Sequence, residues 1–116
     1  MNTTEALANL FKDKITSEIL YEDAICIAFK AKHCLASKHA YLISKQYLNN
    51  LSEAKDCDKA LLGHLMLKAK VVANILGLEK GFRIILNNGI SVGQEVDCLH
   101  LHILGGRKMK WTLGFD

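Results

Sequence analysis

The order of apolar and polar residues along the chain predicts two helices and five strands. After Thr3 and Thr4, which fit a helix cap, Leu7, Leu10 and Phe11 recur at helical spacing. A longer helical period, with apolar residues every three or four positions, ends at a glycine suited to a helix cap. Shorter apolar runs bounded by polar or turn residues are typical of strands. We therefore expect helices over residues 3–12 and 57–76, and strands over residues 19–21, 24–29, 40–44, 81–87 and 95–104.

Strands gathered around one long helix, with links of hairpin length, favour an α+β fold. We expect a five-stranded antiparallel sheet with one long and one short helix, both on one face of the sheet. The chain of 116 residues suits one domain, residues 1–116. Half of the residues are hydrophobic and 23% are charged, a balance that excludes disordered and collagen-like chains.

Strict alternation of apolar and reactive residues makes the last predicted strand the most informative segment. Its leucines and isoleucine are expected to face a core, while Cys98, His100 and His102 share the opposite face. Residues two apart on a strand lie roughly 6.5 to 7 Å apart, so the two imidazoles can reach one small anion or one metal ion together. Neutral imidazole is a nucleophile, and protonation makes it a better leaving group. The pattern indicates a chemical site, with histidines buried only for packing as the alternative interpretation.

The segment 98–107 resembles the signature of the histidine-triad family, in which three histidines alternate with apolar residues. Its Leu-Gly-Gly-Arg end resembles the Hint branch, the purine nucleoside phosphoramidases. The resemblance implies a homodimer with a ten-stranded sheet, and the tail 105–116, with Trp111, is expected at the dimer interface. Other segments resemble that branch at matching separations, namely residues 20–23, 26–29, 61–66 and 81–84.

The resemblance implies hydrolysis of purine nucleoside 5'-phosphoramidates and related nucleotidyl conjugates. His100 matches the histidine that attacks the α-phosphorus and forms a nucleotidyl-histidine, which water then hydrolyses to the nucleoside monophosphate. His102 is expected to neutralise phosphate oxygens or to move a proton. A backbone carbonyl is expected to hold the other ring nitrogen of His100 and to fix its tautomer. This chemistry requires no metal and no cofactor.

Several further residues match positions that bind substrate in the family. Asn87 and Gly93 match residues that contact phosphate, although Asn87 also suits a turn. Leu10 and Phe29, with Leu7, match an apolar cleft that holds the purine, although such side chains are also typical of a hydrophobic core. Glu95 stands where the Hint branch usually has a serine, and a carboxylate there repels phosphate unless a cation or the amine of the substrate lies between them. The residues expected at these substrate-binding positions are Leu10, Phe29, Asn87, Gly93 and Glu95.

The family pattern is incomplete in this chain. Cys98 replaces the first histidine of the triad, and Ala31 replaces an aspartate that binds the ribose hydroxyls. A thiol has one poor donor where an imidazole has two good polar atoms. A catalytically weakened purine-nucleotide-binding or scaffold protein is therefore an alternative function. A zinc-binding protein with Cys98, His100 and His102 as ligands is a second alternative.

Charge and hydropathy restrict the partners. The formal net charge is +3, and the lysines and arginines are scattered, so no nucleic-acid partner is expected. Apolar runs fall short of the 18 or more residues of a membrane span, and the N-terminus does not fit a secretory signal. We expect a cytoplasmic protein without membrane contact, whose four cysteines are free thiols. A structural role is expected for His39, and a surface or hydrogen-bonded role for His64.

Overall fold

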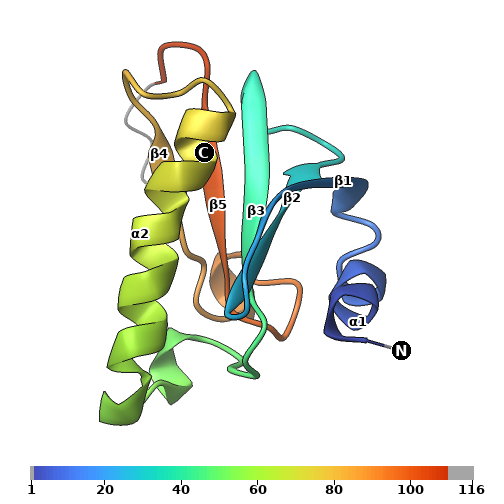
Figure 1. Cartoon of the computed structure of the whole chain (residues 1–116), viewed down its shortest axis with the longest axis vertical. Coiled ribbons are helices and arrows are strands. Elements are labelled where there is room, and N and C mark those ends of the chain that lie inside the picture. Colours follow the sequence, from blue (N-terminus) through green and yellow to red (C-terminus); the bar gives the residue numbers. More distant parts are fainter. Residues whose placement is uncertain (1, 110–116) are drawn as a thin grey trace.

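The computed structural model describes residues 2–109, which form an antiparallel sheet with one α-helix on each face (Figure 1). The strand order is β1-β2-β3-β5-β4. These five strands and the two α-helices confirm the predicted fold class. In chain order the elements are α1 (Thr3–Leu10), β1 (Ile15–Glu22), β2 (Cys26–Ala31), β3 (Lys38–Ser44), α2 (Lys59–Ile75), β4 (Arg83–Ile85) and β5 (His100–Gly105), with 3₁₀ turns at Leu51–Glu53, Asp56–Asp58 and Ile90–Val92.

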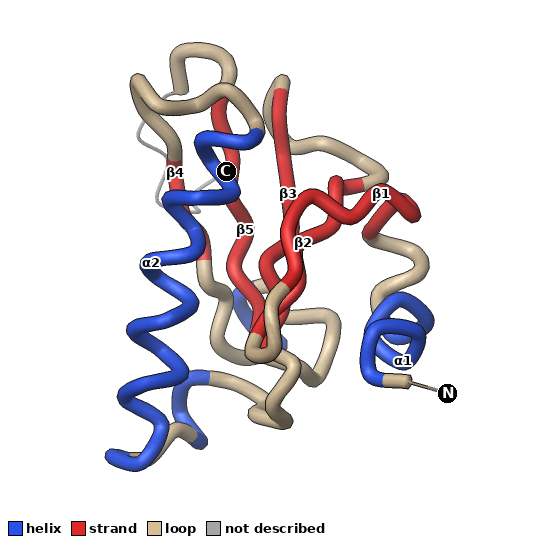
Figure 2. Tube along the Cα trace, in the orientation of Figure 1, coloured by secondary structure: helices blue, strands red, loops and turns tan. Residues whose placement is uncertain are grey.

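The strand β5 lies inside the sheet, between β3 and the edge strand β4 (Figure 2). Its register places Tyr41 opposite His102 and Ile43 opposite His100 on β3. On the other side, Ile85 of β4 lies opposite His102. All six residues of β5 are buried, so both histidines are held within a layer that is covered on both faces.

The helix α2 covers one face of the sheet and forms the larger core. Leu65 and Val72 on α2 are buried in one cluster with Leu99, Leu101 and Ile103. These three residues alternate with the reactive residues, which confirms the predicted division of the strand into two faces. The period of three and four residues along α2 therefore marks the surface that packs on the sheet.

The helix α1 covers the opposite face, which corrects the expectation that both helices share one face. Leu7 of α1 and Phe11 just after it are buried in a second cluster with Phe29, Ile43 and Cys98. The central strands carry apolar residues on both faces, and both faces therefore require a cover. A short amphipathic helix does not itself specify which face it covers, and the expectation failed at that point.

Several predicted boundaries are also corrected. The last strand begins at His100 rather than at residue 95, because the backbone of Leu99 pairs instead with Leu48 and Ser44. The first strand begins at Ile15, several residues earlier than predicted. It is an edge strand that is exposed over much of its length. The polar residues in its first half interrupt the apolar run from which a strand is predicted, so its start was missed. Strand β2 runs over Cys26–Ala31, β3 begins at Lys38, β4 covers only Arg83–Ile85, and α2 covers Lys59–Ile75.

The predicted interface tail 105–116 lies outside the described residues from position 110 onward, and Trp111 with it. Among residues 2–109, none of the helices combines the length and the apolar character needed to cross a membrane. All four cysteines fall in this range and are unpaired.

Adjacent residues of α2 provide a test of the packing. Leu65 is 2% exposed against the sheet, whereas Met66 is 54% exposed. We expect Leu65→Ala to lower the free energy of unfolding by about 2 to 5 kcal/mol, because it opens a cavity in the core. Met66→Ala should change it by less than about 0.5 kcal/mol. Urea denaturation followed by circular dichroism measures both, and equal losses would contradict the assigned orientation of α2.

Candidate active site on the strand β5

His100 is fixed through one ring nitrogen and free at the other. Its Nδ1 donates a hydrogen bond to the backbone carbonyl oxygen of Cys98 at 2.7 Å, which is the carbonyl contact that the family resemblance implied. The ring of Phe11 meets it edge-on at 5.0 Å, and the ring of Tyr41 stacks on it at 5.5 Å. Burial lowers the pKa of His100, against the opposing effect of the Cys98 hydrogen bond. The ring is therefore neutral at pH 7, with its Nε2 lone pair available.

His102 is paired with a third histidine, whose role the sequence did not reveal. Nε2 of His39 lies 3.0 Å from Nδ1 of His102. The backbone N–H of Leu35 donates to Nδ1 of His39 at 3.3 Å, which favours a proton on Nε2 of His39. That proton is donated to Nδ1 of His102, and the proton of His102 then lies on its Nε2. In this arrangement His100 presents a lone pair and His102 presents an N–H.

Burial keeps this pair of rings uncharged. The pKa of His102 falls to about 4, first through burial and then through repulsion from His100, His39 and Lys14. The pKa of His39 also falls to about 4 through burial, although the backbone of His33 acts in the opposite direction. Tyr41 stacks on His39 and packs against His102, so aromatic surface replaces water around both rings.

The Cys98 side chain takes the place of the first triad histidine but is directed into the core. It is buried, and its Sγ lies 3.7 Å from the carbonyl oxygen of Ser44. Burial raises the pKa of the thiol to about 11, so it remains protonated at pH 7. Residue 98 orients His100 through its backbone carbonyl, and every residue type has this group.

A narrow cleft joins the two histidines to an ion pair. The cleft, of about 30 Å³, is lined by His100, His102, Tyr41 and Gly93, together with Lys14, Glu95 and Val96. Nζ of Lys14 lies 2.6 Å from Oε2 of Glu95. The ion pair raises the pKa of Lys14 and lowers that of Glu95, chiefly through their hydrogen bond. Of the two partners expected for a carboxylate at this position, a cation or the amine of the substrate, the structure places a cation, Lys14, beside Glu95. No pattern in the sequence indicated this residue.

The wall of the cleft depends on a glycine and on a buried glutamine. Gly93 has φ +101°, a conformation that side chains disfavour. Nδ2 of Asn87 lies 3.8 Å from the place a Cβ of Gly93 would take, so the predicted phosphate residues are neighbours, although Asn87 does not line the cleft. Gln94, which sequence reasoning missed, is 6% exposed and bonds to the backbone of Gly89, Asn49 and Val96. It therefore fixes the loop that carries Gly93.

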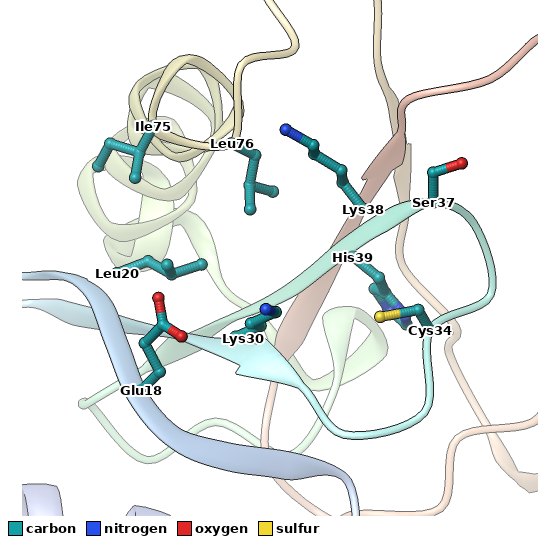
Figure 3. A pocket seen from close by; sticks show the side chains of 9 residues that line it. All are labelled: Glu18, Leu20, Lys30, Cys34, Ser37, Lys38, His39, Ile75 and Leu76. Atoms are coloured by element: carbon teal, nitrogen blue, oxygen red, sulfur yellow. The ribbon is translucent and has the colours of Figure 1, made fainter.

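The predicted purine-binding residues lie apart from this cleft. Phe29 is 2% exposed and packs in the core beneath α1. Leu10 is exposed and lines a separate cavity of about 310 Å³, which also touches Leu7 and Cys98. Another cavity, of about 280 Å³, lies between β1, β3 and the end of α2, and Figure 3 shows Cys34 and His39 among the residues that line it. The structure thus brings together Gly93, Glu95, His100 and His102, but not Leu10 or Phe29.

The zinc alternative requires three donors that converge, and these residues do not provide them. Among residues 2–109, the one set of three histidine, cysteine or acidic donor atoms within 4.8 Å of one another belongs to Asp23, Cys26 and His64. The thiol of Cys98 contacts a carbonyl, and Nδ1 of His102 contacts His39. The geometry of this strand therefore suits imidazole chemistry on an anion better than metal binding.

The buried imidazoles predict how stability depends on pH. In the unfolded chain a histidine pKa is near 6.5, and in the folded chain His39 and His102 have a pKa of about 4. The unfolded chain binds more protons between these values, so the free energy of unfolding is highest above pH 6.5 and falls as pH falls toward 4. We expect His102→Gln to make this fall shallower in urea denaturation. His33→Gln, at an exposed position, is the matched control and should keep the dependence of the native protein.

Comparison with known proteins finds one family over most of the chain. The family model described as HIT domain matches residues 12–109. An uncharacterized HIT-like protein of Synechocystis sp. is 50% identical over 107 residues, which cover 92% of this chain and 94% of that protein. A protein of Zea mays named 14 kDa zinc-binding protein is 39% identical over 107 residues, covering 90% of this chain and 84% of that protein.

Solved structures give the same result. The HIT family hydrolase from Clostridium thermocellum matches with a TM-score of 0.82 and 35% identity, covering 93% of this chain and 95% of that chain. The fold, the matched residues and the paired histidines on β5 lead to one conclusion: this chain belongs to the HIT domain family.

Proposed function

We propose that this protein hydrolyses purine nucleoside 5'-phosphoramidates and related nucleotidyl conjugates through a nucleotidyl-histidine at His100. The observation that carries the proposal is the hydrogen bond from Nδ1 of His100 to the Cys98 carbonyl, which leaves the Nε2 lone pair of a neutral ring beside the cleft. A nucleophile needs this combination of a fixed tautomer and a free lone pair. The similarity to a HIT family hydrolase supports the same reaction class.

The proposed reaction has two displacements at phosphorus. Nε2 of His100 forms a bond to the α-phosphorus, and the bond from phosphorus to the amine nitrogen breaks. The Nε2 proton of His102 passes to the departing amine, since charge collects there as the bond breaks. Water then attacks phosphorus and returns one proton to Nε2 of His102, the bond to His100 breaks, and the nucleoside monophosphate leaves. His39 holds Nδ1 of His102 and thereby keeps the proton of that ring on the substrate side.

Lys14 and Glu95 are proposed to bind the charged groups of the substrate, Lys14 the phosphate and Glu95 the leaving amine. The side chain of Glu95 is 68% exposed and that of Lys14 is 30% exposed, so their ion pair is accessible and worth little to stability. A phosphate that enters the cleft competes with Glu95 for Lys14. The released carboxylate is then available to the leaving amine, which favours amines that carry a positive charge.

A nucleotide-binding protein with weakened catalysis is the second candidate. Two observations favour it: the cleft beside the histidines is only about 30 Å³, and Ala31, in place of the family aspartate, is buried and cannot bind a ribose. The zinc-binding name of the maize relative would make a metal protein a further candidate, but the donor geometry on β5 does not favour a metal there.

The homodimer is also part of the proposal. The strand β4 forms one edge of the sheet, and Phe82 beside it is 38% exposed. Pairing of two β4 edges would join two five-stranded sheets into one of ten strands and would cover this apolar side chain. The ion pair of Lys14 and Glu95 lies within one chain and does not require the second copy.

Replacement of the two histidines separates hydrolysis from binding alone. We expect His100→Ala to lower kcat for adenosine 5'-phosphoramidate by at least about 10⁴-fold, because the nucleophile is lost. His102→Ala should lower it by about 10² to 10⁴-fold. Mass spectrometry of the native protein, quenched in alkaline denaturant, should find one added nucleotidyl group on the peptide with His100. Equal background rates in the native protein and His100→Ala would favour the binding protein.

The missing triad histidine gives a separate test. The carbonyl of residue 98 holds His100, and the thiol is directed toward Ser44. We therefore expect Cys98→Ala to change kcat by less than about threefold. A tenfold or larger loss, in a variant with an unchanged circular dichroism spectrum, would show that the thiol itself takes part in the reaction.

A further inference from the structure

A second group of reactive side chains lies on the face of the sheet that α2 covers. Asp23 follows β1, Cys26 begins β2, and His64 lies on α2. One ligand atom of each lies within 4.8 Å of the other two. Cys26 belongs to the core cluster of Leu101 and α2, not to the cluster on the histidine side of the sheet. The group is therefore separate from the cleft described above.

The carboxylate of Asp23 is held firmly, with one oxygen directed toward the group. Its Oδ1 accepts the backbone N–H groups of Ile25 and Cys26, each at 2.8 Å, which fixes the hairpin turn. Its Oδ2 accepts from the hydroxyl of Tyr21 at 2.8 Å and from Nε2 of His64 at 2.7 Å. These hydrogen bonds lower the pKa of Asp23, although burial opposes them, and the carboxylate is ionised at pH 7.

We propose that Asp23, Cys26 and His64 form a binding site for a thiophilic divalent cation such as Zn²⁺. The donor set of one sulfur, one imidazole nitrogen and one carboxylate oxygen is typical of zinc and unsuited to Mg²⁺ or Ca²⁺, which prefer several oxygen ligands. The ion would take the place of the hydrogen bond between Oδ2 and Nε2. Water or the Tyr21 hydroxyl would complete four ligands.

Burial of the group gives the site an inner wall and an entrance. Cys26 is fully buried, whereas the side chains of Asp23 and His64 are 23% and 25% exposed. An ion can therefore enter between the two exposed ligands and reach the sulfur behind them. Burial and the nearby Asp23 raise the pKa of the Cys26 thiol to about 12. Metal binding displaces this proton to solvent, and the resulting thiolate and carboxylate balance the two positive charges of the ion.

Lys45 and Lys68 lie near enough to act on the thiol, and both lower its pKa. Lys45 is paired with Glu22 at 2.8 Å, and the ammonium of Lys68 lies 5.6 Å from the centre of the Tyr21 ring. These charges favour the thiolate but repel a cation. The balance favours an ion that forms a strong bond to sulfur over one that is held by charge alone.

Zinc titration of the whole chain, after removal of metal with a chelator, tests the proposal. Isothermal calorimetry should give one Zn²⁺ per chain, and zinc should raise the melting temperature. Cys26→Ala and His64→Gln should each weaken zinc binding by at least about tenfold. Cys98→Ala and His102→Gln are the matched controls on the other face, and both should bind zinc as the native chain does.

Cobalt provides a readout that reports on sulfur directly. Co²⁺ in place of zinc should give a thiolate-to-metal charge-transfer band that is absent in Cys26→Ala and present in Cys98→Ala. His64→Gln keeps an amide that can donate to Asp23, so it remains informative even where Cys26→Ala does not fold. The proposal is wrong if the native chain binds no zinc, if either ligand variant keeps native affinity, or if His102→Gln abolishes binding. These readouts do not involve hydrolysis, so this proposal and the proposed function can fail separately.

Discussion

The site depends on the burial of β5 on both of its faces. A polar ring in such a strand must find a hydrogen-bond partner within the protein, because an unpaired buried group is costly. His100 finds the carbonyl of Cys98, and His102 finds His39. The requirement to satisfy each ring at one nitrogen leaves the other nitrogen of each available beside the cleft. The reactivity proposed for this strand therefore has the same origin as the hydrogen bonding that stabilises the fold.

This arrangement explains how a chain can lack the first histidine of the triad and keep the geometry of the second. The group that orients His100 is a main-chain oxygen, and substitution at residue 98 does not remove it. His39, from a different strand, contacts the third histidine. The support of the site is thus shared between the backbone of β5 and a side chain of β3, and neither part is the thiol of Cys98.

Alternation along residues 98–103 was sufficient to predict the strand, its two faces and the shared side of the two histidines. The helical period was sufficient to predict α2. Sequence reasoning did not find Lys14 beside Glu95, His39 beside His102 or Asp23 beside His64, whose partners are 81, 63 and 41 positions apart. Such pairs are brought together by strand order and helix placement, which local periodicity does not encode. The predictions for the face that α1 covers and for the start of β1 failed for a related reason. A short helix and a polar edge strand contain few apolar residues, so their periodicity says little about where they pack.

The absence of net charge around the cleft affects how it binds free inorganic anions. Burial leaves both imidazoles without charge near pH 7, and Glu95 already cancels the ammonium of Lys14. A resting pocket with no net charge has little attraction for free inorganic anions, which remain better solvated outside. In the proposed reaction, occupancy would be decided by contacts that only a conjugate with a departing group makes, and no fixed positive field would retain the released nucleotide.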